Sequence, residues 1–221
     1  REFLREIYQV NPNIILVLVA GSSLAVNWEN EHLPAIVNAW YPGEQGGTAV
    51  AEVLFGDYNP AGRLPLTYYK SLEELPPFDD YDITKGRTYQ YFKKDVLYPF
   101  GYGLSYTTFK YSNLEVTDAG KTVNVSFTLK NTGKRAGDEV VQVYVKLPEV
   151  AGGTQAIKQL KGFQRVALKA GESRKVEITV DKEQLRYWDE KQTCFVVPQG
   201  SFTFMVGASS NDIRLENTTN L

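Results

Sequence analysis

Two polar positions near the N-terminus of this 221-residue chain have the setting of ligand contacts. Ser22 lies in Gly21-Ser22-Ser23, directly after the apolar run of residues 14–20, and Glu44 lies in the glycine-rich turn of residues 42–47. Loops that follow the strands of an open α/β sheet form the crevice in which ligands bind. Ser22 is therefore a candidate hydrogen-bonding partner for a ligand, and Glu44 a candidate polar contact. The alternative for Glu44 is a solvated or capping carboxylate, which the dipole of a following helix favours.

The single histidine and the single cysteine limit the chemistry of the chain. A serine nucleophile needs an adjacent base that a third group orients, but His32 lies ten residues after Ser22 in a polar segment. One histidine and one cysteine, Cys194, also predict neither a zinc site nor an internal disulfide. The turn at residues 42–47 lacks both a lysine and the Gly-x-Gly-x-x-Gly pattern of a nucleotide site. We expect no metal and no cofactor.

Charge and hydropathy exclude two classes of partner. The chain has 24 basic and 26 acidic side chains, a net charge of −2 and no basic stripe, so it lacks the electrostatic footprint of a nucleic-acid binder. The longest apolar run, residues 14–20, is much too short to span a membrane. We therefore expect neither a nucleic acid nor a membrane as a partner.

The first 66 residues predict the end of an open α/β sandwich domain. Apolar residues at helical spacing indicate a helix over residues 1–10, and residues 14–20 form a β-branched run that is apolar on both faces. Such a strand is typical of a parallel sheet covered by helices. Two further helices are predicted, near residues 33–39 and over residues 47–55, the second ended by Gly56.

The rest of the chain predicts a connector and an all-β domain. Residues 67–108 are rich in tyrosine and proline and show little periodicity, which is typical of a long functional or wrapping loop. Residues 109–221 contain about seven alternating apolar and polar runs separated by turn signals. This pattern predicts an antiparallel β-sandwich of fibronectin III-like type. Tyr144, Phe163, Trp188 and Phe195 are expected to pack in its core or at an interface.

Several motifs resemble one enzyme family. Residues 39–47 (Ala-Trp-Tyr-Pro-Gly-Glu-Gln-Gly-Gly), 53–65 and 97–107 (Leu-Tyr-Pro-Phe-Gly-Tyr-Gly-Leu-Ser-Tyr-Thr) look like the C-terminal half of glycoside hydrolase family 3. Residues 130–133 (Lys-Asn-Thr-Gly), 137–144 (Gly-Asp-Glu-Val-Val-Gln-Val-Tyr) and 158–163 resemble the fibronectin type III-like domain at the end of many members. The resemblance extends in order over essentially the whole chain.

The resemblance implies a retaining β-glycosidase whose catalytic groups lie elsewhere. Family members bring an Asp nucleophile from a (β/α)8 barrel together with a Glu acid/base from the α/β domain. The resemblance implies that both of these catalytic residues precede residue 1. We thus expect no catalytic residue in this chain. The expected partners are the upstream barrel, the remainder of the α/β domain, and an oligosaccharide or glycoside substrate. Residues 85–92 are similar to β-xylosidase and arabinosidase members, which favours xylose over glucose.

Aromatic and basic side chains complete the candidate substrate contacts. Trp28, Trp40 and Tyr41 are candidates for a wall that stacks on a sugar ring, although Trp40 follows Ile36-Val37 and equally suits a core position. Arg87 either shapes the substrate entrance or docks the connector against the barrel, since its rigid fork of donors suits carboxylates. The predicted substrate contacts are therefore Ser22, Trp28, Trp40, Glu44 and Arg87.

A rival interpretation makes the chain a non-catalytic module. In it, the β-sandwich binds a carbohydrate or a protein, and the N-terminal segment is an appendage. The apolar strand over residues 14–20 speaks against this rival, because it would expose an apolar surface unless more structure covers it. The substrate class suggests a periplasmic or secreted protein, with a cytoplasmic location still open.

Overall fold

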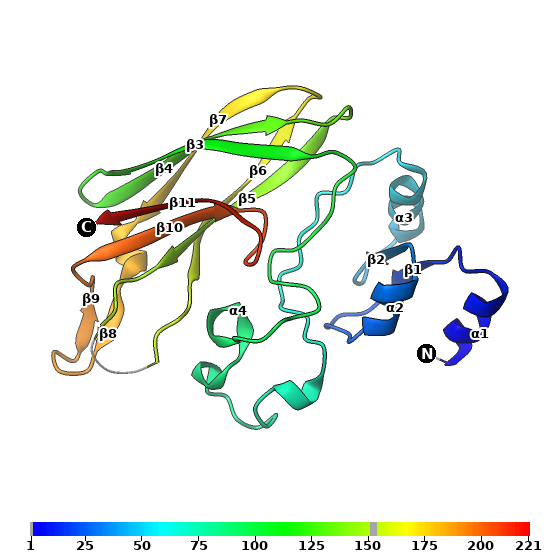
Figure 1. Cartoon of the computed structure of the whole chain (residues 1–221), viewed down its shortest axis with the longest axis horizontal. Coiled ribbons are helices and arrows are strands. Elements are labelled where there is room, and N and C mark those ends of the chain that lie inside the picture. The colour runs from blue at the N-terminus through cyan, green and yellow to red at the C-terminus, as the bar shows by residue number, and fades with distance from the viewer. Residues whose placement is uncertain (1, 151–153) are drawn as a thin grey trace. The chain divides into compact units, whose positions relative to one another are not determined.

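The computed structural model describes residues 2–150 and 154–221. It divides into two compact units (Figure 1). The first, here called the α/β unit, comprises residues 1–58, 67–74 and 95–98. The second, the sandwich unit, comprises residues 59–66, 75–94 and 99–221. The connector expected over residues 67–108 thus contributes segments to both units.

The α/β unit contains a short parallel sheet with helices before and after each strand. Its elements are α1 (Glu2–Val10), β1 (Ile15–Leu18), α2 (Asn27–His32), β2 (Ala35–Asn38), α3 (Gly46–Phe55) and the 3-10 helix η1 (Leu72–Glu74). Strands β1 and β2 pair in parallel, with Ile15 opposite Ala35 and Leu18 opposite Asn38. The predicted strand and the predicted first and last helices are confirmed, and Gly56 ends α3 in the left-handed conformation with φ 81°.

The helix predicted near residues 33–39 is wrong. Ala35–Asn38 form strand β2, and the helix of this region is the earlier, six-residue α2. Ile36 and Val37 are β-branched, and their backbone is paired with β1. β-branched side chains suit a strand better than a helix, so pairing with β1 overrides the weak helical pattern.

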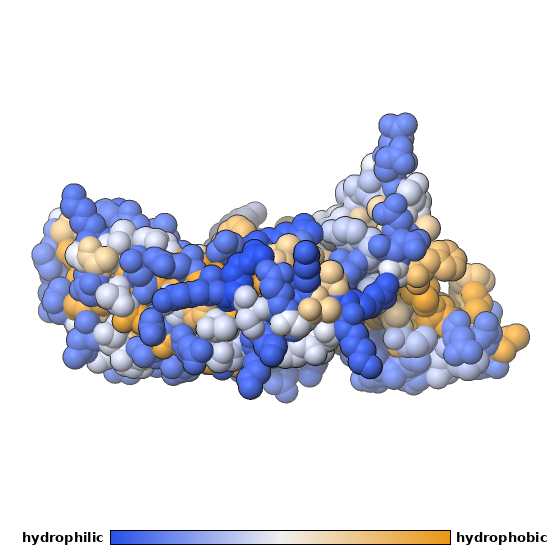
Figure 2. Space-filling model, turned by 90° about the horizontal axis from the view of Figure 1, so that it is seen from above, coloured by the Kyte–Doolittle hydropathy of each residue, from blue (hydrophilic) through white to orange (hydrophobic). Residues whose placement is uncertain are grey.

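The α/β unit carries much exposed apolar surface, seen at the right-hand end of Figure 2. Phe3, Val10, Val19, Tyr41 and Phe55 are all more than half exposed. No residue of β1 or β2 is fully buried, in contrast to the buried strand expected from the sequence. Apolar surface of this extent is typical of a face that another protein segment covers.

The sandwich unit consists of two antiparallel sheets and a hairpin. Its strands are β3 (Phe109–Asp118), β4 (Thr122–Asn131), β5 (Gly137–Lys146), β6 (Gln159–Leu168), β7 (Ser173–Asp181), β8 (Tyr187–Asp189), β9 (Cys194–Val196), β10 (Ser201–Gly207) and β11 (Ile213–Asn220). The sheet orders are β11-β10-β5-β6 and β3-β4-β7, with β8-β9 as the separate hairpin. Helix α4 (Thr88–Tyr91) and the 3-10 helices η2 (Ile83–Lys85) and η3 (Lys182–Leu185) complete it.

The core of the sandwich comes from the alternating residues of both sheets. Phe127 and Leu129 of β4 are fully buried, as are Val143 of β5 and Phe204 of β10. Every second side chain of a strand points to the same face, so one apolar face per sheet meets the other in a common core. The predicted antiparallel sandwich is confirmed, and so is the fold class of an α/β part followed by an all-β part.

The aromatic side chains expected to pack in this domain separate into two groups. Tyr144 is fully buried, as predicted. Phe163, Trp188 and Phe195 are 68%, 51% and 60% exposed, so they do not lie in the core, and their packing at an interface stays a prediction. Trp188 and Phe195 instead pack edge to face on the two-stranded β8-β9 hairpin, with ring centroids 5.2 Å apart. This hairpin is too small to bury them.

Part of the connector is anchored tightly on the sandwich. The Leu64 amide donates to the Tyr102 carbonyl at 2.8 Å, and the Gly101 amide donates to the Leu64 carbonyl at 2.7 Å. At Gly103 a Cβ atom would lie 2.2 Å from the Gly62 carbonyl oxygen, so only glycine permits this approach. Tyr89 stacks on Phe100 with centroids 4.5 Å apart and accepts a hydrogen bond from the Leu160 amide.

Candidate functional site

Three of the five predicted substrate contacts lie in the loops that follow β1 and β2. They are Ser22, Trp40 and Glu44. Because the strands are parallel, their carboxyl ends meet at one edge of the sheet. The Ala39 amide, just after β2, donates to the Leu18 carbonyl at the end of β1 at 2.8 Å. Ser22 is exposed in the loop after β1. Trp40 and Glu44 follow β2 in the next loop.

Direct contact holds the two loops together. The absent Cβ of Gly21 would lie 2.5 Å from the ring of Tyr41, so the loop after β1 packs its glycine on an aromatic of the loop after β2. Any larger residue at position 21 would have to displace this ring. Ser22 thus lies beside the loop that carries Trp40 and Tyr41, and the predicted contacts of Ser22 and Trp40 with a substrate stay predictions.

The loop after β2 has a constrained backbone. Trp40 adopts a left-handed conformation with φ 55°, and Gly43 adopts φ 66°. Left-handed backbone is unusual for a bulky residue and occurs where the surrounding structure enforces it. Trp40 is partly buried, so its side chain is available both for packing and for a ligand.

Glu44 is exposed two residues before the first residue of α3. Gln45 is the N-cap residue and makes no side-chain capping hydrogen bond. The positive end of the helix dipole favours a carboxylate here. Both interpretations of Glu44, as a ligand contact and as a charge that stabilises the helix, are compatible with this placement.

Trp28 lies at the start of α2 with its ring engaged by neighbouring side chains. The ring stacks on His32 with centroids 4.5 Å apart and an interplanar angle of 15°, and it meets Tyr8 edge to face at 5.4 Å. The Arg5 guanidinium lies 5.3 Å from the ring centroid. These contacts join α1 to α2, and Trp28 therefore has a packing role in the α/β unit.

Arg87 belongs to the sandwich unit and is held by the connector itself. Its guanidinium donates to the carbonyl oxygens of Pro76 at 3.1 Å and of Pro77 at 2.6 Å. The Nε atom is buried and has no hydrogen-bond partner among the residues the structure describes. The structure thus gives Arg87 a bracing role, and its predicted contact with substrate stays a prediction.

Sequence reasoning missed two polar groups of the α/β unit. The Asn38 amide at the end of β2 donates to the Tyr68 hydroxyl at 2.9 Å, and burial raises the pKa of Tyr68. Glu29 in α2 is buried, and its Oε2 atom has no hydrogen-bond partner within the described chain. Asn38 is the first polar residue after Ile36-Val37 and could have been found had β2 been predicted as a strand. Nothing in the sequence distinguishes Glu29 from a solvated helix carboxylate.

Within residues 2–150 and 154–221, no three His, Cys, Asp or Glu side chains gather in a way that would hold a metal ion. No helix in this part of the chain combines the length and the apolar character needed to cross a membrane.

Comparison with known proteins matches the N-terminal and the C-terminal part of the chain to two domain families. Residues 1–106 match the glycosyl hydrolase family 3 C-terminal domain, and residues 139–210 match the fibronectin type III-like domain. Residues 1–106 belong to the C-terminal domain of glycosyl hydrolase family 3. The resemblance found in the motifs is therefore confirmed, and the chain corresponds to the C-terminal portion of the family 3 proteins it matches.

Similar proteins carry glycosidase names. The chain is 43% identical over 99% of its length to a xylan 1,4-beta-xylosidase of Xylanibacter ruminicola, of which it covers 25%. It is 36% identical over 97% of its length to a periplasmic beta-glucosidase of Salmonella typhimurium, of which it covers 30%. The crystal structure of a family 3 beta-glucosidase from Bifidobacterium adolescentis superimposes on the whole chain with a TM-score of 0.92 at 34% identity, and the chain covers 34% of that structure. The chain thus spans between a quarter and about a third of these relatives.

Proposed function

We propose that this chain is the C-terminal part of a retaining β-glycosidase that removes terminal β-linked xylose, with glucose as the second substrate. The observation that carries the proposal is the 43% identity over 99% of the chain to a relative named xylan 1,4-beta-xylosidase. The Gly86-Arg87-Thr88-Tyr89 segment, similar to xylosidase members, supports the same sugar. The proposed domains are residues 1–66 of the α/β sandwich domain, a connector over 67–108 and the fibronectin-like domain over 109–221.

In this proposal the chain supplies one wall of the active site and the scaffold that holds it. Retention requires two carboxyl groups about 5–5.5 Å apart across the glycosidic bond. We assign both to an upstream (β/α)8 barrel and the remainder of the α/β domain, and none to this chain. The strand-end loops with Ser22, Trp40 and Glu44 would contact the sugar through a hydroxyl, an aromatic face and a carboxylate. The exposed apolar surface of the α/β unit would pack against the partners.

A periplasmic or secreted location is part of the proposal. Its support is the substrate class together with the relative named periplasmic beta-glucosidase.

The test is hydrolysis of aryl β-xyloside and aryl β-glucoside by this chain joined to its upstream gene portion. We expect a higher kcat/KM for the xyloside. A Glu44→Gln variant should lose about tenfold in kcat/KM, because it replaces a charged hydrogen-bond acceptor worth roughly 1.5–3 kcal/mol by a neutral one worth roughly 0.5–1.5 kcal/mol. The matched control is Glu52→Gln on the outside of α3, which should keep the activity of the parent.

Two results would count against these assignments. A higher kcat/KM for the glucoside would reverse the proposed order of sugars. Equal activity of the Glu44 and Glu52 variants would remove Glu44 from the site and leave it a role at the start of α3 only.

A further inference from the structure

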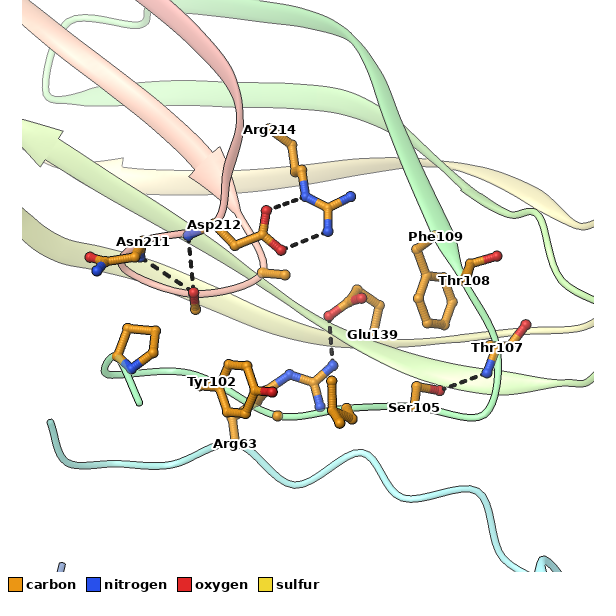
Figure 3. A pocket seen from close by; sticks show the side chains of 15 residues that line it. Arg63, Tyr102, Ser105, Thr107, Thr108, Phe109, Glu139, Asn211, Asp212 and Arg214 are labelled. Atoms are coloured by element: carbon orange, nitrogen blue, oxygen red, sulfur yellow. Dashed lines mark hydrogen bonds and ion pairs between the residues drawn. The ribbon is translucent and has the colours of Figure 1, made fainter. Parts of the chain in front are cut away.

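The sandwich unit contains a cavity that the proposed active site does not use. Its volume is about 440 Å³, within the range of small-molecule sites, and segments of the connector, β3, β5 and the turn between β10 and β11 line it (Figure 3). The turn is rigid because the Ser209 hydroxyl accepts hydrogen bonds from the Asn211 and Asp212 amides at 3.3 and 3.0 Å. The Ala208 amide also donates to the Asp212 carbonyl. The cavity is therefore largely preformed.

Two ion pairs face each other across the cavity in Figure 3. Arg63, in the 59–66 segment of the sandwich unit, donates to Glu139 of β5 at 2.8 Å, and Arg214 of β11 makes a bidentate pair with Asp212 of the turn. The lining thus carries two positive and two negative charges and is neutral overall. A neutral lining that combines charged donors and acceptors suits a neutral ligand with many hydroxyl groups, since each hydroxyl both donates and accepts.

One buried donor in the lining lacks a partner. The side chain of Arg63 is only 8% exposed, and its Nη atoms donate to the Gly62 carbonyl and to Glu139. Its Nε atom is buried with no hydrogen-bond partner in the described part of the chain. A buried N–H without an acceptor costs free energy, so the Arg63 guanidinium still has hydrogen-bonding capacity beyond the bonds to Gly62 and Glu139.

Apolar groups line the cavity together with these polar ones. Tyr102 and Phe109 are ring-bearing residues on opposite sides of the lining in Figure 3, and neither is fully exposed. Aromatic rings bind the C–H surface of a sugar ring while polar neighbours bind its hydroxyl groups. A linear polyol presents no such flat surface.

We propose that this cavity binds a neutral sugar ring of pentose or hexose size, as a second sugar site located in the sandwich unit. The Arg63-Glu139 and Asp212-Arg214 pairs would bind the hydroxyl groups, and Tyr102 and Phe109 would contact the ring. This inference goes beyond the proposed function, because the residues that line the cavity have no part in the hydrolysis proposed above.

The test is binding of xylose and glucose to the 221-residue chain, which needs no enzymatic activity. We expect saturable binding with a Kd in the millimolar range by isothermal titration, as for ligands of about ten non-hydrogen atoms. Amide signals of Ser209, Asn211 and Asp212 should shift in NMR spectra on addition of the sugar. An Arg214→Met variant should raise the Kd at least tenfold.

The matched control is Arg174→Met, since Arg174 forms a similarly exposed ion pair with Glu172 but does not line the cavity. This variant should bind like the parent, and both variants should show parent-like NMR spectra in the absence of sugar. The proposal is overturned if neither sugar binds, if Arg214→Met binds as well as the parent, or if glucuronate binds more tightly than glucose. The last result would indicate an anion site.

Discussion

Replacing Glu139 by alanine should lower the free energy of unfolding of the sandwich unit by about 3–5 kcal/mol. Glu139 and Arg63 form a buried ion pair at 2.8 Å, and their side chains are 6% and 8% exposed. The Glu139 carboxylate also accepts from the Val140 amide at 2.9 Å. Without it, the Arg63 guanidinium would remain buried with an uncompensated charge. Urea unfolding followed by circular dichroism measures the loss.

The control is Glu172→Ala, which breaks the exposed pair with Arg174 on the same unit. Exposed pairs contribute about 0–1 kcal/mol, so this variant should unfold almost like the parent. A double variant, Arg63→Met with Glu139→Leu, should recover much of the stability, because it removes both charges together. Equal losses for Glu139→Ala and Glu172→Ala would show that the buried pair has no special role.

Asn131→Ala should produce the second large loss, about 3 kcal/mol or more. The Asn131 side chain is fully buried and makes four hydrogen bonds. Its amide nitrogen donates to the carbonyl oxygens of Arg135 and Leu168, and its oxygen accepts from the Thr107 hydroxyl at 2.6 Å and from the Gly133 amide at 3.0 Å. Alanine would leave these groups without this partner in the interior.

Asn124→Ala provides the comparison for this variant. Asn124 lies on the same strand, β4, and its side chain accepts a single exposed hydrogen bond from Thr179 at 3.2 Å. Its replacement should change the unfolding free energy by less than about 1 kcal/mol. If both asparagine variants unfolded at the same urea concentration, the buried hydrogen bonds of Asn131 would contribute little to the stability of the sandwich unit.

The sequence was most informative where a pattern repeats locally. The alternation Val123, Val125, Phe127, Leu129 predicts a strand with one buried face, and all four side chains are fully buried in β4. The helix predicted in place of β2 shows the limit, since a run as short as Ala35-Ile36-Val37 fits both periods and only its pairing with β1 decides.

Polar positions were harder to predict because their partners lie far along the chain. Glu139 and Asn131 fall within motifs that carry the family resemblance, yet nothing in the motifs shows that Glu139 pairs with Arg63, 76 positions away. Ser22 could be predicted as a residue at the end of a strand. Its neighbourhood with the loop that carries Trp40 and Glu44 could not, because residues 33–39 were predicted as a helix and only the structure pairs β2 with β1. The engagement of Trp28 by His32, Tyr8 and Arg5 depends on tertiary contacts that no spacing reveals.

The most direct test of the central claim is hydrolysis of aryl β-xyloside by the purified 221-residue chain, alone and after mixing with the separately produced upstream portion of its gene. We expect no turnover by the chain alone and turnover in the mixture, because both catalytic carboxyl groups are assigned to the upstream portion. Turnover by the chain alone would contradict this assignment, and Glu44 and the buried Glu29 would then be the first carboxylates to replace.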